Sequence, residues 1–536
     1  MSDSTPRFTR RQVGGALASL AAGLLQPGVA FAAGGGVDGP HAPASPSLPP
    51  GGAHPALGRP GGGRWGPPRR FSWDLLVDRA RRMATQPYVA PRPSAHAAAD
   101  WDSFVRMAYG AAEYVTGTVR LFPTRRGVAP LPVSIHVVDH GVARKLIDTR
   151  GLFGGGQAVD AAGWRVLAPD ARTDWMAFLS ASYFRCSGTS NRYGLSARGI
   201  AVDTGLGELE EFPAFTDFWI EQPSDDHVIA HALLDGPSLT GAYAIDTRRR
   251  EGVDVVQDVR CTLFLRRDVQ RLGIAPQTSM FLYDQTRADG MPHAHAIGDW
   301  RPQVHDSGGL AIRTGIGERI WRPLRNPPAA RMNAFRADHP SGFGLMQRNR
   351  DFCSYEDDEL FYELRPSLWV QPQGDWGTGS VMLYEMASIS ETVDNIGAFW
   401  VADEPARAGQ RRDLAYRLTW TSADPSTDTN AHCRNLLIGP SGPVHEPPDP
   451  TQRKYVIDFH GDVLAGLDEA CGVQAVANLP AAAVIGLRAH PLYGRNNAWR
   501  VVLDLRLTGL AQKEFRLFLR RGAQALSETV VIALGD

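Results

Sequence analysis

Two aspartates stand in short polar blocks where acid–base chemistry could be carried out. Asp306 lies in VHDSGG and Asp394 lies in ETVDN. A pair of carboxyl groups can act as general acid and general base when one holds a proton and the other is ionised. The two residues are far apart in the sequence, so only the fold could bring them together. On residue type alone, the simpler interpretation is a turn aspartate before Ser307 and a strand-end or capping aspartate before Asn395.

Several aromatic and basic side chains in the same part of the chain could bind a sugar. Aromatic rings stack on the apolar faces of sugars, and arginine donates hydrogen bonds to hydroxyl groups. For each aromatic residue the alternative is packing in the core. Glu391 and Asp351 could orient neighbours or simply form salt bridges. The candidate substrate-binding residues are Tyr362, Arg365, Trp369, Tyr193, Arg198 and Trp300.

Other kinds of chemistry find little support in the sequence. The chain has no phosphate-binding loop, no dinucleotide fingerprint after a strand and no H-E-x-x-H motif. No pair of its five cysteines has metal-ligand spacing, so we expect neither a metal nor a cofactor. A formal net charge of −1 does not favour nucleic acid or an acidic membrane surface as a partner. In an oxidising compartment Cys433 and Cys471 could form a bridge, with buried free thiols as the alternative.

The first 32 residues have the order of a signal peptide. Arg10 and Arg11 precede an apolar stretch at 14–25, and an A-x-A site follows at 30–32. The adjacent arginines favour the twin-arginine export route; an ordinary secretory signal is the alternative, because Val13 stands where that route often prefers Phe. The apolar stretch is too short for a membrane span. We therefore expect a periplasmic protein, followed at 33–70 by a disordered linker rich in Gly and Pro.

The elements that must position the candidate residues are mostly strands. One helix is expected after Ser72, where Leu76, Ala80 and Met83 recur at helical spacing. Alternation of polar and apolar residues at 133–137, 260–266, 414–420, 501–507 and 515–519 predicts strands with one buried face. We expect a mainly β protein, with a large N-terminal β-sandwich followed by a smaller immunoglobulin-like β-sandwich.

A polar segment at 401–413 predicts the boundary between the two domains. It contains Pro405 and Gly409 and lies between two strand-like runs. The large sandwich would then cover 71–400 and the immunoglobulin-like one 414–536, which are ordinary domain sizes.

Eight polar–aromatic blocks occur within the β region, and their order carries a resemblance. The blocks are ASYFR (181–185), YGLSARGIAVDT (193–204), EEFPAFTDFW (210–219), LTGAY (239–243), LGIAPQTSMF (272–281), RPQVHDSGGL (301–310), RPSLWVQP (365–372) and ETVDNIGAFW (391–400). With these blocks in this order, the chain from about Phe71 to Glu528 resembles the periplasmic proteins of osmoregulated glucan biosynthesis, and its adjacent arginines favour the D branch of that family.

The resemblance implies action on linear β-1,2-glucan in a cleft of the large sandwich. It implies an anomer-inverting endo-glucanase or a transglycosylase able to close rings, with Asp394 as general acid and Asp306 as general base. β-1,2-Glucan chains are then the expected partners, together with the inner-membrane glucan synthase. The alternative is a non-catalytic glucan-binding or scaffold protein of glucan backbone synthesis.

One departure from the family pattern concerns water activation. Family members often read HDSDGL, whereas this chain reads HDSGGL, with Gly308 in place of an acid. Loss of a carboxylate beside the path that activates water would slow hydrolysis and favour transfer.

Overall fold

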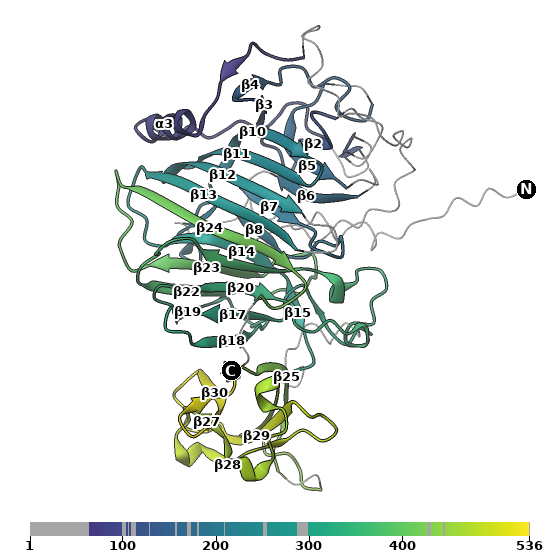
Figure 1. The fold of residues 1–536 in the computed structure, drawn as a ribbon, viewed down its shortest axis with the longest axis vertical. Coiled ribbons are helices and arrows are strands. Elements are labelled where there is room, and N and C mark those ends of the chain that lie inside the picture. Colours follow the sequence, from purple (N-terminus) through teal and green to yellow (C-terminus); the bar gives the residue numbers. More distant parts are fainter. Residues whose placement is uncertain are drawn as a thin grey trace, which may run out of the picture.

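A computed structural model describes residues 64–534, except 99–102, 105–106, 109–113, 128, 156–157, 169–172, 180–181, 208–209, 250–253, 287–298, 426–429 and 443–444. The expected signal peptide and most of the expected linker lie outside the described residues. Strands dominate the described chain, so the mainly β prediction is confirmed (Figure 1).

The largest sheet runs through most of the molecule. Its strands, in spatial order, are β1 (Arg69–Arg70), β4 (Val142–Lys145), β3 (Ser134–Asp139), β10 (Ala214–Ser224), β11 (His227–Asp235), β12 (Leu239–Arg249), β13 (Val255–Leu265), β24 (Arg411–Thr421), β21 (Ser367–Pro372), β20 (Gly342–Met346), β17 (Gly309–Arg313), β18 (Arg319–Pro323), β32 (Thr529–Ala533), β30 (Glu514–Arg521) and β27 (Val473–Ala477), with β31 (Gln524–Ala525) beside β30.

A second sheet packs against the largest one. Its strands are β19 (Arg331–Arg336), β22 (Gly379–Glu385), β23 (Ile396–Ala402), β14 (Leu272–Ser279), β8 (Ser196–Arg198), β7 (Tyr183–Cys186), β6 (Asp174–Leu179), β5 (Ala161–Leu167) and β2 (Val119–Pro123), with β9 (Ile200–Val202) beside β14. Leu263 of β13 and Trp400 of β23 belong to one buried cluster. Alternate side chains of each strand therefore fill the space between two layers, as the period of two predicted.

The predicted helix is α3 (Trp73–Ala84), and it covers part of the outer face of the largest sheet. The Ser72 side chain caps it by accepting a hydrogen bond from the Leu75 amide at 3.3 Å. Leu76, Val77 and Ala80 are its buried residues, and they pack in a cluster with side chains of β11, β12 and β13.

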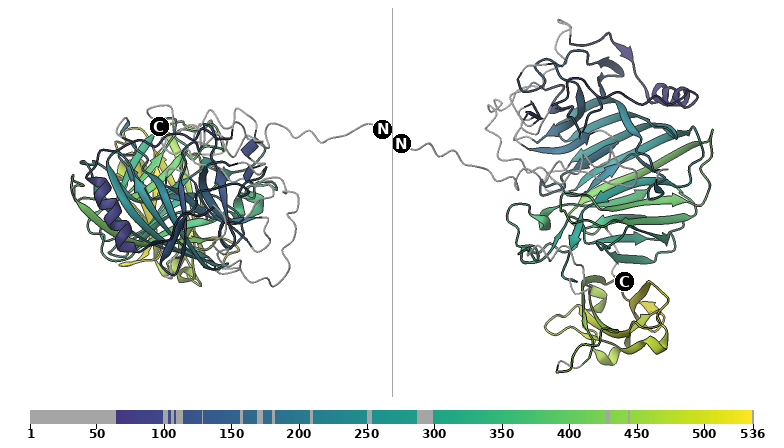
Figure 2. Two further views of the ribbon diagram at one scale, coloured as in Figure 1. Left: turned by 90° about the horizontal axis from the view of Figure 1, so that it is seen from above. Right: turned by 180° about the vertical axis from the view of Figure 1, so that it is seen from behind.

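The C-terminal part adds a second two-layer unit at one end of the molecule (Figure 2). One layer is a separate sheet of β25 (His432–Pro440), β26 (Gln452–His460), β29 (Ala498–Arg506) and β28 (Val484–Pro491). The other is β32, β30 and β27, which extend the largest sheet because β32 lies parallel to β18. A shared core spans the junction and includes Trp321 and Trp369 from the largest sheet.

Short 3₁₀ turns and one ribbon complete the described chain. The ribbon pairs β15 (Phe281–Tyr283) with β16 (Val304–His305). The turns are η4 (Phe352–Ser354), η5 (Tyr362–Leu364), η6 (Asp462–Leu464), η7 (Glu469–Cys471) and η8 (Ala481–Ala483).

One expectation about the C-terminal half needs revision, and one pair of alternatives is decided. The run at 414–420 is β24, which pairs with β13 and β21 in the largest sheet rather than opening the second unit. We therefore move the proposed boundary to the connection between β24 and β25. Cys433 and Cys471 are both free thiols. Cys433 is buried on β25, whereas Cys471 lies in η7 and contacts Asp468, so no bridge forms.

Candidate active site

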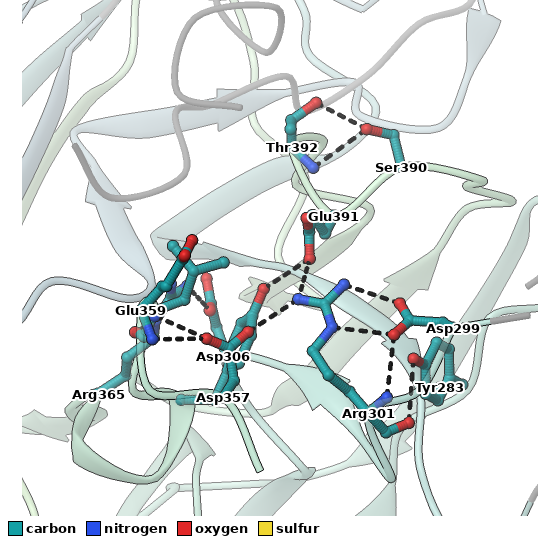
Figure 3. Close-up of polar contacts among 12 residues, drawn as sticks. Tyr283, Asp299, Arg301, Asp306, Asp357, Glu359, Arg365, Ser390, Glu391 and Thr392 are labelled. Carbon is teal, nitrogen blue, oxygen red and sulfur yellow. Dashed lines mark hydrogen bonds and ion pairs between the residues drawn. The ribbon is translucent and has the colours of Figure 1, made fainter. Parts of the chain in front are cut away.

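Asp306 directly follows β16 and is fully buried. Its amide donates to the Met280 carbonyl at 2.9 Å, which fixes the backbone beside the β15–β16 ribbon. Its Oδ1 forms an ion pair with Arg365, and its Oδ2 has no hydrogen-bond partner (Figure 3). Burial raises the pKa of Asp306, and the Arg365 guanidinium opposes that shift.

The Arg365 side chain is presented by a strained turn. Phe361 has φ of 49°, a left-handed conformation that is unusual for a bulky residue, and η5 begins immediately after it. The turn buries Tyr362 and places the Arg365 guanidinium 4.1 Å from the centroid of its ring. Arg365 therefore holds Asp306, and the Tyr362 ring packs against the Arg365 guanidinium.

Asp394 lies just before β23 and is 2% exposed. Its Oδ2 accepts a hydrogen bond from Thr278 Oγ1 at 3.1 Å, and its Oδ1 has no hydrogen-bond partner. Burial raises the pKa of Asp394 well above its usual range, and the negative charge of Asp306 raises it further. The fold thus brings the two predicted carboxyls near enough to interact electrostatically.

A charged network lies beside the pair. Arg301 contacts Asp299 at 2.8 Å, Asp357 at 2.9 Å and Glu391 at 2.7 Å (Figure 3). Glu391 also accepts a hydrogen bond from the Tyr362 hydroxyl at 3.0 Å, so the network is connected to the turn that holds Asp306. Glu391 therefore forms a salt bridge with Arg301, which was one of the two roles considered for it, and it also contacts the Tyr362 hydroxyl.

Trp300 adjoins this network and is 69% exposed. An exposed indole has no role in core packing, so its exposure favours the sugar-stacking interpretation over the core alternative.

Tyr193 and Arg198 approach the site from the second sheet. Arg198 is buried on β8, and its positive charge acts on Asp394. Tyr193 packs under Arg185 of β7, whose guanidinium lies 4.1 Å from the ring centroid. Arg185 also acts on both carboxyls.

Trp369 does not join the other candidates. Side chains alternate along β21, so Leu368 and Val370 enter the main core while Trp369 points to the opposite side. There it packs in the core shared with the C-terminal part. The core-packing alternative therefore describes this tryptophan, and we withdraw it from the candidate binding residues.

Three residues of the site were not singled out from the sequence: Arg301, Thr278 and Ser196. Each lies inside a block quoted for the family resemblance, at 301–310, 272–281 and 193–204, but nothing in residue type distinguished it from its neighbours. Among the described residues no group of His, Cys, Asp or Glu is arranged to hold a metal ion.

Gly308 lies two residues after Asp306 and directly before β17. A Cβ at this position would stand 3.5 Å from Gln347 Oε1 and 3.6 Å from His305 Cε1, which are ordinary contact distances. Gln347 Oε1 and His305 Nδ1 are buried without hydrogen-bond partners. The position therefore accommodates a Cβ, and this chain has no acidic side chain there.

Comparison with known proteins gives one consistent result. A family model described as periplasmic glucan biosynthesis protein MdoG matches residues 71–534. Glucans biosynthesis protein D 2 of Ralstonia nicotianae is 40% identical over 497 residues, covering 86% of this chain and 90% of the relative. Glucans biosynthesis protein D is 37% identical over 489 residues in Stenotrophomonas maltophilia and 38% identical over 492 residues in Xanthomonas campestris pv. campestris, covering 87% of this chain and 90% of each relative.

Proposed function

We propose that this chain, which belongs to the periplasmic glucan biosynthesis protein MdoG family, acts on linear β-1,2-glucan as an anomer-inverting transglycosylase or endo-glucanase. The family agrees with the periplasmic location expected from the N-terminal sequence. Within the described residues no helix is long and apolar enough to cross a membrane.

The observation that carries the proposal is the contrast between the two buried carboxyls. Asp306 contacts a guanidinium, which favours its ionised form, whereas Asp394 contacts a hydroxyl and is close enough to Asp306 to interact with it. Two nearby carboxyls with such different neighbours divide into a proton donor and a proton acceptor. We assign the donor role to Asp394 and the acceptor role to Asp306.

The same assignment serves hydrolysis and transfer. Asp394 gives its proton to the glycosidic oxygen as the bond from that oxygen to the anomeric carbon breaks. The anomeric carbon is attacked from the opposite face by an oxygen of water or of a glucan hydroxyl, whose proton passes to Asp306. Attack by water gives a shortened chain, and attack by a hydroxyl of the same chain closes a ring.

Gly308 favours transfer between these outcomes. An acid beside Asp306 would add an acceptor close to the water-derived proton, and a Cβ at position 308 meets only ordinary contacts. Without that acid, the removal of a proton from the attacking water is less favourable, whereas protonation of the leaving oxygen by Asp394 is unaffected.

The test is to incubate the mature protein with linear β-1,2-glucan and to analyse the products by mass. Transfer within a chain gives rings that lack one water relative to linear products of equal length. If linear products with new reducing ends form rapidly and rings do not, transfer is excluded and the activity is hydrolysis. The proposal of catalysis fails if glucan is bound but recovered unchanged.

A non-catalytic role is the second candidate, and Gly308 is the observation that favours it. A protein that has lost part of its water-activating path could bind glucan chains and present them to the inner-membrane glucan synthase. Unchanged glucan with retained binding is the result that this candidate expects.

A further inference from the structure

Two hydroxyl side chains form a chain of hydrogen bonds behind Asp394. Ser196 of β8 and Thr278 of β14 are direct partners in the antiparallel pairing of these strands. Their side-chain oxygens are 2.5 Å apart, and Thr278 donates to Asp394 Oδ2 at 3.1 Å. Both residues are essentially buried. The connection therefore runs from one strand to the next and ends on the proposed acid.

A bulge in β14 gives Thr278 its direction. Leu272 and Ile274 face the main core, and simple alternation would turn Thr278 toward that core as well. The pairing with β23 instead shifts register between Ile274 and Gln277, and Ala275 has φ of 49°. The extra residue reverses the alternation, so that Gln277 faces inward and accepts from the Leu345 amide. Thr278 then faces Asp394. Bulges beside active sites often redirect a side chain in this way.

We propose that Ser196 and Thr278 are positioning residues that hold Asp394 and stabilise its carboxylate after it has given up its proton. The inference rests on the proposed function, in which Asp394 is the proton donor. A hydroxyl has one proton to donate and can also accept. When Thr278 donates to Asp394, Ser196 must supply the proton shared between the two hydroxyls.

The hydroxyl pair suits a group that changes its charge in every cycle. While Asp394 is protonated, it can donate to Thr278, and Thr278 can then donate to Ser196. Once the proton has moved to the glycosidic oxygen, rotation of the two hydroxyls turns the pair into a donor toward the new carboxylate. No side chain has to move to make this change.

Other charged and titratable groups also act around Asp394. Asp306 raises the pKa of Asp394, while Arg198 of β8 and Arg185 of β7 lower it. Tyr183 of β7 interacts electrostatically with Asp394 and forms a side-chain hydrogen bond with Ser196, so it adjoins the far end of the hydroxyl chain. The Thr278 hydrogen bond lowers the pKa of Asp394, so its removal should raise that pKa.

The experiment replaces the hydroxyl and keeps the shape. Since activity needs protonated Asp394, rates fall as pH rises through its pKa. In Thr278→Val this alkaline limb should move to higher pH by roughly one unit. The kcat should fall about tenfold while KM stays unchanged, because the carboxylate formed in the reaction loses a hydrogen-bond donor and no proposed contact to substrate is removed. Ser196→Ala should move the limb in the same direction by a smaller amount.

Thr278→Ser is the matched control, since it keeps the hydroxyl and removes the methyl group. It should behave like the wild-type protein. A limb that stays in place in Thr278→Val, or a Thr278→Ser variant as impaired as Thr278→Val, would overturn the proposal.

A direct measurement separates this inference from the proposed activity. The carboxyl band of Asp394 can be followed by infrared difference spectroscopy against Asp394→Asn, with no substrate present. In Thr278→Val its midpoint should rise by the same roughly one unit. A band that titrates unchanged contradicts the positioning role, whereas a shifted band without glucan turnover contradicts only the proposed function.

Discussion

At the residue scale, the two aspartates differ in the group that each contacts: a guanidinium for Asp306 and a hydroxyl for Asp394. Both carboxyls are buried, and burial alone would push both toward the protonated form. The guanidinium of Arg365 contacts Asp306 and favours its charge, while the neutral hydroxyl of Thr278 contacts Asp394. The charge kept on Asp306 then makes a second charge on Asp394 less favourable. Arg365 therefore favours the ionised form of Asp306, and the charge on Asp306 adds to the effect of burial in raising the pKa of Asp394.

Replacement of Asp394 by Asn should remove activity while keeping shape. The amide cannot protonate the glycosidic oxygen, so turnover should fall by roughly two or more orders of magnitude whether the acceptor is water or sugar. Binding of linear β-1,2-glucan should persist, because the arginine and tryptophan contacts remain. Product mass and calorimetric binding measure the two effects. Asp139→Asn, an exposed carboxyl at the end of β3, is the control. Near-normal turnover in Asp394→Asn would show that the acid is misassigned.

An acid restored at position 308 should favour hydrolysis. A Cβ there meets only ordinary contacts, so Gly308→Asp should fold without rearrangement. Its carboxylate would lie beside Asp306 and provide a second acceptor for the proton of water. We expect the ratio of new reducing ends to rings to rise by about tenfold. Gly308→Ala adds the Cβ without the carboxylate and should keep the wild-type ratio. An equal shift in both variants would mean that shape, not charge, is responsible.

At the scale of elements, the sequence predicted strand alternation and the helix cap. It did not predict the register between strands or the side of the sheet to which each side chain points. Ser72 predicted the start of α3, and the alternation near 260–266 and 501–507 predicted parts of β13 and β29. The β14 bulge left no such signal, although it decides that Thr278 faces Asp394. Trp369 packs in the core shared with the C-terminal part. The sequence did not show this, because alternation does not reveal which of two cores an outward side chain enters. The role of β24 depends on its pairing with β13, which is a long-range contact.

The contact between the two parts of the molecule should depend on one buried ion pair. Glu528, just before β32, contacts Arg348 at 2.6 Å and accepts from the Cys433 amide at 2.8 Å. Glu528→Gln would remove this charge and leave Asp424, at 3.2 Å, as a carboxylate partner of Arg348, at a cost of about 3 kcal/mol in unfolding free energy. Urea denaturation of the full chain at pH 7 measures this loss. Asp268→Asn breaks an exposed pair with Arg407 and should have no measurable effect.

The pH dependence of this contact has a definite sign. Burial opposes the charge on Glu528, but Arg348 and His432 outweigh it and lower its pKa to about 2. An unfolded glutamate has a pKa of roughly 4.3. A group with a lowered folded-state pKa stabilises the protein above the unfolded value and loses that contribution as pH falls toward the folded value. The difference between wild type and Glu528→Gln should therefore shrink from about pH 4 to about pH 2. A difference that stays constant over this range would contradict the assignment.

At the scale of the whole molecule, the candidate site draws on segments far apart in the sequence. Asp306 follows the β15–β16 ribbon, Arg365 follows η5, and Asp394 precedes β23 of the second sheet. Side chains of β7, β8 and β14 complete it from neighbouring strands. Such a site forms only after both sheets have paired. If the adjacent arginines direct export of the folded protein, this long-range pairing is completed before export.

Export of the folded protein is the expectation that follows, and it rests on Arg10 and Arg11. The twin-arginine route carries folded proteins and reads the adjacent arginines themselves, rather than their charge alone. Replacing both with Lys keeps the charge and should leave most of the precursor in the cytoplasm. Fractionation followed by immunoblotting distinguishes precursor from the mature form. Lysine replacement of Arg69 and Arg70, which form β1 in the mature chain, is the matched control and should leave export unchanged. Full processing and periplasmic recovery of the Arg10→Lys, Arg11→Lys protein would instead assign it to the general secretory route, with folding after translocation.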